Sequence, residues 1–212
     1  MTAAEKMDIV MLVPGNDEYA TFDALLSSRK RSLRVRDVRY EILKHPRRDP
    51  GCFHEAPGVL QPYQNRAHYA LVVLDHEGSG QEERTADEIA ADLGIRMAQS
   101  GWSTNRTAVL VLQPELENWV WSDSSEVARA IGWTGQNPSL RRWLMDRGVW
   151  PQGEDKPSRP KECFEFALRE ARTKRSSAIY RELAEKVGLQ RCQDQGFHAF
   201  LAMMRKWFPA QR

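Results

Sequence analysis

Two acidic residues follow the most apolar stretch of the chain. Asp75 and Glu77, separated by His76, come directly after residues 69–74, a run typical of a strand buried on both faces of a parallel sheet. Side chains at positions i and i+2 of a strand point the same way, so we expect the two carboxylates to share one site. Hard oxygen ligands of this kind suit Mg²⁺ or Mn²⁺, and open α/β sheets bind ligands where their strands end.

Further acidic residues follow other predicted strands. Glu18 comes after the first strand, and Glu115 and Glu117 come after the last. We expect at least one of them to complete the metal site, where an ion would polarise a phosphate and activate water. His76 is then a candidate general acid or base. Acidic residues at the start of a helix also complement its dipole, and this alternative stays open.

Alternating strands and helices are expected to position these residues. A helix is predicted from an N-cap at position 16 or 17 to about position 28, and another after Thr85, which has the spacing of a capping box with Glu88. The Pro- and Gly-rich segment 49–62 is predicted to be irregular. This alternation predicts an α/β fold with a mostly parallel four-stranded sheet flanked by helices. The strands are expected at residues 8–13, 35–43, 69–74 and 107–112.

Strand signals stop after residue 122, which divides the chain into an α/β core (1–122) and a helical C-terminal region (123–212) packed on that core. The last three predicted helices have apolar stripes that suit packing. Tryptophans are concentrated between Trp102 and Trp150, across the boundary between the two regions, and their expected role is core packing. The alternative is a partner surface, because aromatic residues are enriched at interface cores. The residues concerned are Trp119, Trp121, Trp133, Trp143 and Trp150.

Residues 29–48 form the most basic segment, with nine basic residues against two acidic ones. One interpretation is a solvated edge strand protected by its charges. The other is a contact surface for nucleic-acid phosphates, formed by Arg34, Arg36 and Arg39 together with Lys161. The net charge of the chain is only +2, so its overall composition does not favour either interpretation.

Composition and motifs also limit the compartment in which the protein is expected and the chemistry that it can perform. The three cysteines, far apart in the 212 residues, indicate reduced thiols in a cytoplasmic protein. The apolar run near the N-terminus is too short for a signal peptide or a membrane span. No P-loop, no G-x-G-x-x-G after a strand and no G-x-S-x-G is present. The sequence leaves open whether the chain forms a homo-oligomer.

Several segments resemble Toprim-like domains. VMLVPGNDEYATFDALL resembles their first strand and helix, and VVLDHEGSG resembles their second acidic motif, usually D-x-D. VLVLQPELENWVWSD resembles the P-E-(I/L)-E-x-W segment of small Toprim-related proteins from bacterial anti-phage defence islands. KPSRPKECFEFAL and CQDQGFHAFLAMMRKWF resemble the C-terminal helices of the same proteins, which include a component of the methylation-associated defence system.

The resemblance implies a Toprim-like fold and a divalent-metal site for phosphodiester cleavage, working with other proteins of a defence system and with DNA or RNA. Asp75 and Glu77 match the acidic pair. Pro14 stands where the first-motif Glu is expected, so Glu18 or Glu115 would replace it as catalytic acid or base, or as ligand. The alternative is a degenerate, non-catalytic subunit that binds partner proteins or nucleic acid in the defence complex.

Overall fold

Four parallel strands form a single sheet in the computed structural model, which describes residues 6–189, 192 and 194–210. Their order across the sheet is β2-β1-β3-β4. The predicted α/β class with helices flanking a four-stranded sheet is confirmed, and every pairing is parallel. The strands are β1 (Met7–Val13), β2 (Tyr40–Lys44), β3 (Ala67–Asp75) and β4 (Thr107–Leu112).

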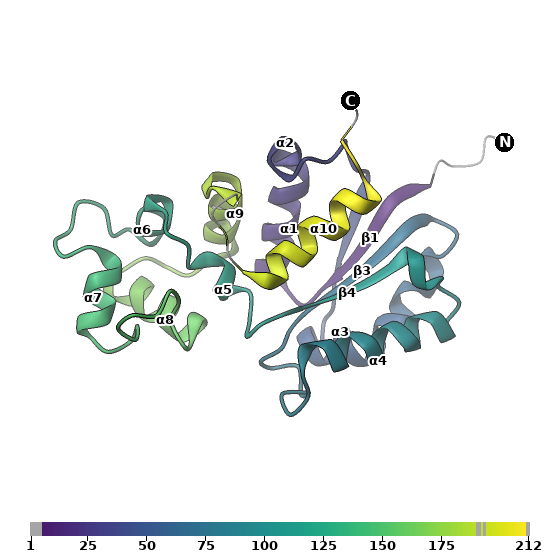
Figure 1. Ribbon diagram of the computed structural model, residues 1–212, viewed down its shortest axis with the longest axis horizontal. Helices are drawn as coiled ribbons and strands as arrows, with labels where there is room; N and C mark the ends of the chain where they lie inside the picture. Colours follow the sequence, from purple (N-terminus) through teal and green to yellow (C-terminus); the bar gives the residue numbers. More distant parts are fainter. Residues whose placement is uncertain (1–5, 190–191, 193, 211–212) are drawn as a thin grey trace.

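Helices cover both faces of the sheet and extend beyond one end of it (Figure 1). One face carries α1 (Asn16–Ser28), α2 (Lys30–Leu33) and α10 (Gln195–Trp207), and the other carries α3 (Arg48–Leu60) and α4 (Ala86–Gln99). Beyond the carboxyl ends of the strands lies a group of helices that we call the helical lobe. It consists of α5 (Glu117–Val120), α6 (Ser125–Ile131), α7 (Leu140–Asp146), α8 (Pro160–Glu170) and α9 (Ser177–Lys186).

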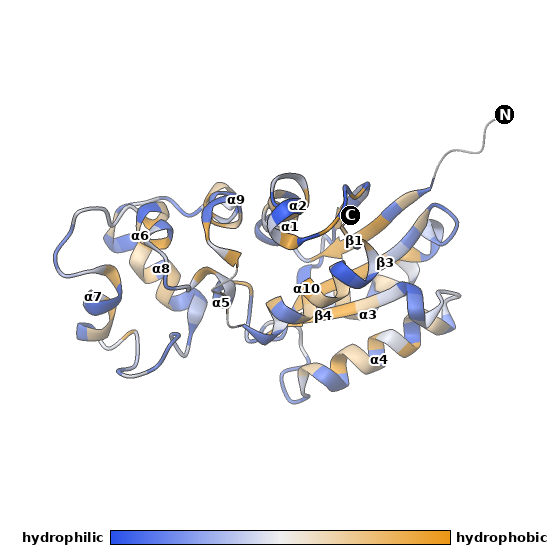
Figure 2. Ribbon diagram, turned by 45° about the horizontal axis from the view of Figure 1, so that its top comes forward, coloured by the Kyte–Doolittle hydropathy of each residue, from blue (hydrophilic) through white to orange (hydrophobic). Residues whose placement is uncertain are grey.

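Side chains alternate between two apolar cores along the strands, as the strand period requires. In β3, Leu71 and Val73 face the core under α1 and α10, whereas Val72 and Leu74 face the core under α3 and α4. The strands are accordingly among the most hydrophobic elements in Figure 2. The same alternation places Asp75, the last residue of β3, on the α1 side of the sheet.

The C-terminal helices pack on the α/β core. α9 lies along α1, and α10 lies against β4. The Tyr69 ring of β3 stacks on Trp207 of α10 with ring centroids 4.5 Å apart. In the helical lobe, Trp121 packs edge-on against both Trp150 and Phe164. Both of these tryptophans are buried, which agrees with core packing rather than a partner surface.

Residues 49–62 are not irregular, as was predicted from their Pro and Gly content. α3 runs through Pro57, which has no N–H to donate to the carbonyl of Phe53 one turn earlier. Arg96 of α4 supplies the missing donor: its Nη1 lies 2.8 Å from the Phe53 oxygen. The prediction was therefore wrong because a residue distant in sequence repairs the hydrogen bond that proline removes. The capping box of Thr85 and Glu88 at the start of α4 is confirmed.

The second strand is shorter than predicted and starts later. It covers Tyr40–Lys44 rather than 35–43, and Val35 makes only an isolated bridge to Pro209. β2 is an edge strand, as expected from its charges. The basic residues just before it lie at the amino end of the sheet. Arg36 binds Asp8 through two guanidinium nitrogens at 2.8 and 3.1 Å.

The three cysteines are free thiols. Within the described residues, we find no helix with the length and apolar character needed to cross a bilayer.

The ion pair of Asp8 provides a test of what the basic segment does. Asp8 is buried, and besides Arg36 it accepts the backbone N–H of Arg39 at 2.8 Å. We expect Asp8→Asn to lower the free energy of unfolding by about 1–3 kcal/mol, because it weakens charge-assisted hydrogen bonds. Urea denaturation measures this.

The matched control is Asp37→Asn, because Asp37 pairs with Lys30 with its side chain 84% exposed. We expect that change to stay within about 0.5 kcal/mol. Equal effects of the two substitutions would contradict a structural role for the Asp8 pair.

Candidate metal site

The carboxyl ends of the strands border a pocket of about 400 Å³, which we call the acid pocket. The chain leaves β1 toward β2 on one side and returns to β3 on the other, so the pocket opens where the strand order reverses. Open α/β sheets bind their ligands at such a point. The lining residues are Pro14, Gly15, Asn16, Asp17, Glu18, Lys44, His45, Pro46, Arg48, Asp49, Asp75, Glu117, Lys161 and Arg175.

Three buried carboxylates form a cluster at this edge of the sheet, and two of them, Asp75 and Glu117, line the pocket. Asp75, Glu115 and Glu117 each offer an oxygen atom, and these atoms lie within 4.8 Å of one another. Asp75 ends β3, whereas the two glutamates follow β4. The backbone N–H of Leu116 donates to Asp75 Oδ1 at 2.9 Å, which holds the segment after β4 over the end of β3. The backbone N–H of Asp75 donates to Asp49 Oδ1 at 2.8 Å, which holds the start of α3 there as well.

The helical lobe contributes partners to the two glutamates. Glu115 accepts the backbone N–H of Lys161 at 2.8 Å, and the Lys161 Nζ lies 3.8 Å from its other oxygen. Glu117 accepts the Tyr180 hydroxyl at 2.6 Å and Arg175 Nη2 at 3.1 Å. Helices α8 and α9 and the turn between them therefore complete a site that the sheet begins.

The acidic residues of the pocket are poorly neutralised. Burial raises the pKa of Asp75 well above its usual range, and the neighbouring charges of Glu18 and Asp49 raise it further. Burial also raises the pKa of Asp49, and it raises the pKa of Glu115 to about 7. Burial, together with the neighbouring acids, therefore disfavours the charged form of these carboxyl groups more than the nearby cations favour it.

Glu18 is the fourth buried acid of the site. It lies in the first turn of α1 and lines the pocket beside Pro14. Burial raises its pKa to about 7, and the charges of Asp49, Asp17 and Glu117 act in the same direction. A carboxyl group with a pKa near 7 can both hold and accept a proton at neutral pH.

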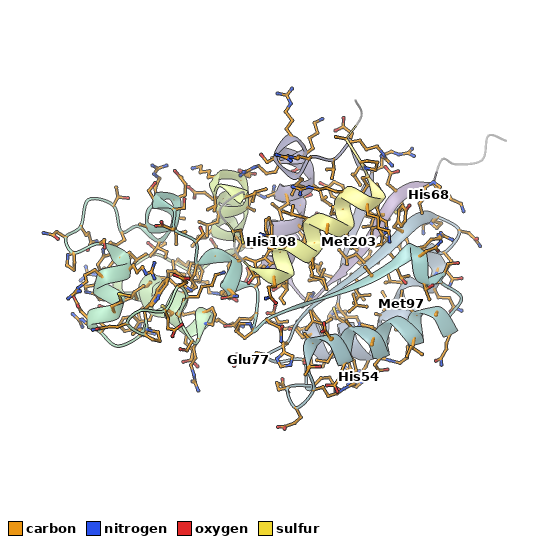
Figure 3. The ribbon with its side chains drawn as sticks, in the orientation of Figure 1. His54, His68, Glu77, Met97, His198 and Met203 are labelled. Carbon is orange, nitrogen blue, oxygen red and sulfur yellow. The ribbon has the colours of Figure 1, made fainter. Side chains whose placement is uncertain are left out.

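Two predicted site residues do not join the cluster. Glu77 is exposed in the loop after β3 (Figure 3), because the strand ends at Asp75 and the i, i+2 argument no longer applies. His76 falls on the opposite side of the sheet from Asp75, and its Nε2 lies 2.7 Å from the carbonyl oxygen of Arg84. Neither residue lines the acid pocket.

Of the predicted phosphate-binding residues, only Lys161 lies at this site. Arg36 and Arg39 interact with Asp8 near the start of β1, at the opposite end of the sheet, and Arg34 precedes them there. The sequence reasoning missed Asp49, Arg175 and Tyr180. An acidic residue before Pro50 is a helix-start signal that could have identified the first. No local pattern marks the other two.

The residues present fit a hard divalent cation. The donors are carboxylate oxygens from three residues that are all buried, and burial disfavours the charged form of Asp75 and Glu115, which a bound cation would stabilise. Comparison with protein-family models, with curated proteins and with solved structures gave no match to this chain.

The pKa of Glu18 makes stability depend on pH when no metal is present. Its carboxyl has a pKa near 4.5 when unshifted and about 7 in the folded protein. Between these pH values the folded state binds more protons, so the free energy of unfolding falls as pH rises. We expect Glu18→Gln to reduce this decline by about 3 kcal/mol, as measured by urea denaturation in EDTA.

Glu83→Gln serves as the control, because Glu83 is exposed in the loop before α4 and should leave the pH dependence unchanged. A decline that is as steep in Glu18→Gln as in the wild type would show that Glu18 ionises normally.

Proposed function

We propose that this chain is a Toprim-like phosphodiesterase that uses Mg²⁺ or Mn²⁺ to cleave nucleic acid. The observation that carries the proposal is the cluster of Asp75, Glu115 and Glu117 at the carboxyl edge of a parallel sheet. Carboxylate ligands at such an edge suit a cation that also binds substrate phosphates. The sequence resemblance to Toprim-like domains supports the same reaction class.

The residues around the cluster have distinct roles in this proposal. Asp75, Glu115 and Glu117 would hold the cation, which when bound supplies charge neutralisation at the phosphate and a more acidic water. Glu18 holds or accepts a proton at neutral pH, since its pKa is about 7. Tyr180 and Arg175 fix the orientation of the Glu117 carboxylate through their hydrogen bonds to Oε1.

We propose further that the protein acts in bacterial anti-phage defence together with partner proteins. The support is the resemblance of the segment around Glu115 and of the C-terminal helices to small Toprim-related proteins of defence islands. A non-catalytic subunit is the second candidate. It is favoured by Pro14 in the first motif and by Lys161 and Arg175, which already pair with two of the three clustered carboxylates.

Metal binding separates the two candidates. We expect Mn²⁺ at pH 8 to raise the melting temperature of the wild type by about 3–10 °C, as for a ligand near 100 times its Kd. Asp75→Asn should lose this increase. The variant should still fold, because an amide oxygen can accept the Leu116 N–H and a buried charge is removed.

The matched variant is Glu77→Gln, which should respond to Mn²⁺ like the wild type because Glu77 is exposed outside the cluster. A wild type that does not respond, or an Asp75→Asn protein that responds fully, would contradict the metal site.

Cleavage is tested directly with labelled DNA and RNA in Mn²⁺. We expect Glu18→Gln to lower the rate by roughly 10²-fold or more, the usual contribution of a general acid or base. Equal rates for the wild type and Asp75→Asn would refute the enzymatic assignment. Metal binding without cleavage of either polymer would favour the non-catalytic candidate.

A further inference from the structure

Four cations line the acid pocket, and they differ in what they already bind. Lys161 and Arg175 pair with the buried glutamates Glu115 and Glu117. Lys44 donates from Nζ to the side chain of Asn16 at 2.8 Å. These three are committed to the protein itself, so a ligand would have to compete with existing contacts to reach them.

Arg48 is the exception. It begins α3, lines the acid pocket and is exposed. Among the residues that the structure describes, none forms a hydrogen bond or an ion pair with its guanidinium. The position is nevertheless close to the acids. Burial raises the pKa of Asp17 and of Asp49, and the positive charge of Arg48 is one of the effects that oppose this rise.

The turn that presents Arg48 is held firmly by His45. This histidine is 4% exposed, its Nδ1 accepts the backbone N–H of Arg47 at 3.1 Å, and its Nε2 lies 3.2 Å from Glu55. The ring packs so closely on Gly51 that a Cβ there would collide with it. Arg48 itself has a φ of 51°, a conformation that glycine adopts more easily. Arg48 therefore occupies a backbone conformation that favours glycine.

The acid pocket is thus lined both by an unpaired, planar cation and by Asp75 and Glu117 of the cluster that suits a divalent metal. An anion with several oxygens can contact the metal and the Arg48 guanidinium at the same time. Phosphate is such an anion, and a guanidinium binds it through two parallel hydrogen bonds. We propose that Arg48 binds a phosphate of the substrate, a single strand of DNA or RNA, in the acid pocket. The identity of the substrate rests on the proposed function, whereas the phosphate site rests on the geometry around Arg48.

Arg48→Gly is the informative variant, because glycine accepts the backbone conformation. Arg172→Gly is its matched control: Arg172 is also exposed with a φ of 56°, but it lies outside the acid pocket. Fluorescence anisotropy with short labelled DNA and RNA strands, in Ca²⁺, measures affinity as a function of salt.

We expect Arg48→Gly to weaken binding about tenfold or more. It should also reduce the slope of log affinity against log salt by about 0.7, the contribution of one phosphate contact on a single strand. Arg172→Gly should change neither quantity. Equal affinities and slopes for the two variants would overturn the proposal, and the comparison of DNA with RNA shows which polymer is bound.

A second measurement needs no polymer. Phenylglyoxal modifies unpaired arginine side chains, and mass spectrometry measures the extent of modification at each arginine. In Mg²⁺, inorganic phosphate should slow the modification of Arg48 about fivefold or more, according to its occupancy, and leave Arg172 unaffected. If phosphate protects neither residue, the inference fails even where Mn²⁺ stabilises the protein. If neither polymer binds but phosphate protects Arg48, the site stands and the nucleic-acid substrate fails.

Discussion

Asp75, a buried acid, joins three distant segments at one point of the sheet edge through its carboxylate and its backbone N–H. It accepts the N–H of Leu116 after β4, and its own backbone N–H donates to Asp49 at the start of α3. A carboxylate removed from water is costly unless positive charge compensates it. Its neighbours here are mainly other acids, with Lys161 as the opposing charge. At this edge of the sheet, several carboxylates therefore lie close together with too little positive charge from the chain to balance them.

Asp8, at the other end of the sheet, is a buried carboxylate that the chain neutralises with its own arginine, Arg36. Asp8 and Asp75 are both 5% exposed. The pKa of Asp8 is lowered, chiefly by its hydrogen bonds to Arg36, whereas the pKa of Asp75 is raised. Although their exposed fractions are equal, Asp75 is the more deeply buried of the two and has no arginine partner among the described residues, so the pKa values of these two aspartates shift in opposite directions. At the amino end of the sheet, Arg36 pairs with the buried carboxylate of Asp8. At the carboxyl end, the buried carboxylates lack enough positive partners, which leaves room for a ligand. Uncompensated charge in a cleft is typical of functional sites.

Local patterns predicted the sheet and the position of Asp75 well, since apolar runs and strand period depend on neighbouring residues. They failed where distant residues decide the outcome. Glu77 was misplaced because the strand ends two residues earlier than the i, i+2 argument needs. α3 was missed because Arg96 replaces the hydrogen bond that Pro57 removes. Tyr180 reaches Glu117 from 63 positions further along the chain, and no local motif encodes that contact.

Pro14 stands where the proposed Toprim-like function expects an acidic residue, and the nearby Glu18 is the candidate to replace it. Glu18 lies four positions later, yet both residues line the same pocket. The α1 N-terminus makes this arrangement compact: a Cβ at Gly15 would lie only 3.1 Å from Glu18 Oε2, so the carboxylate folds back over the turn that follows β1. A glycine there keeps that approach open. Under the proposed Toprim-like function, Glu18 in the first turn of α1 would supply the carboxylate expected at the end of the first strand.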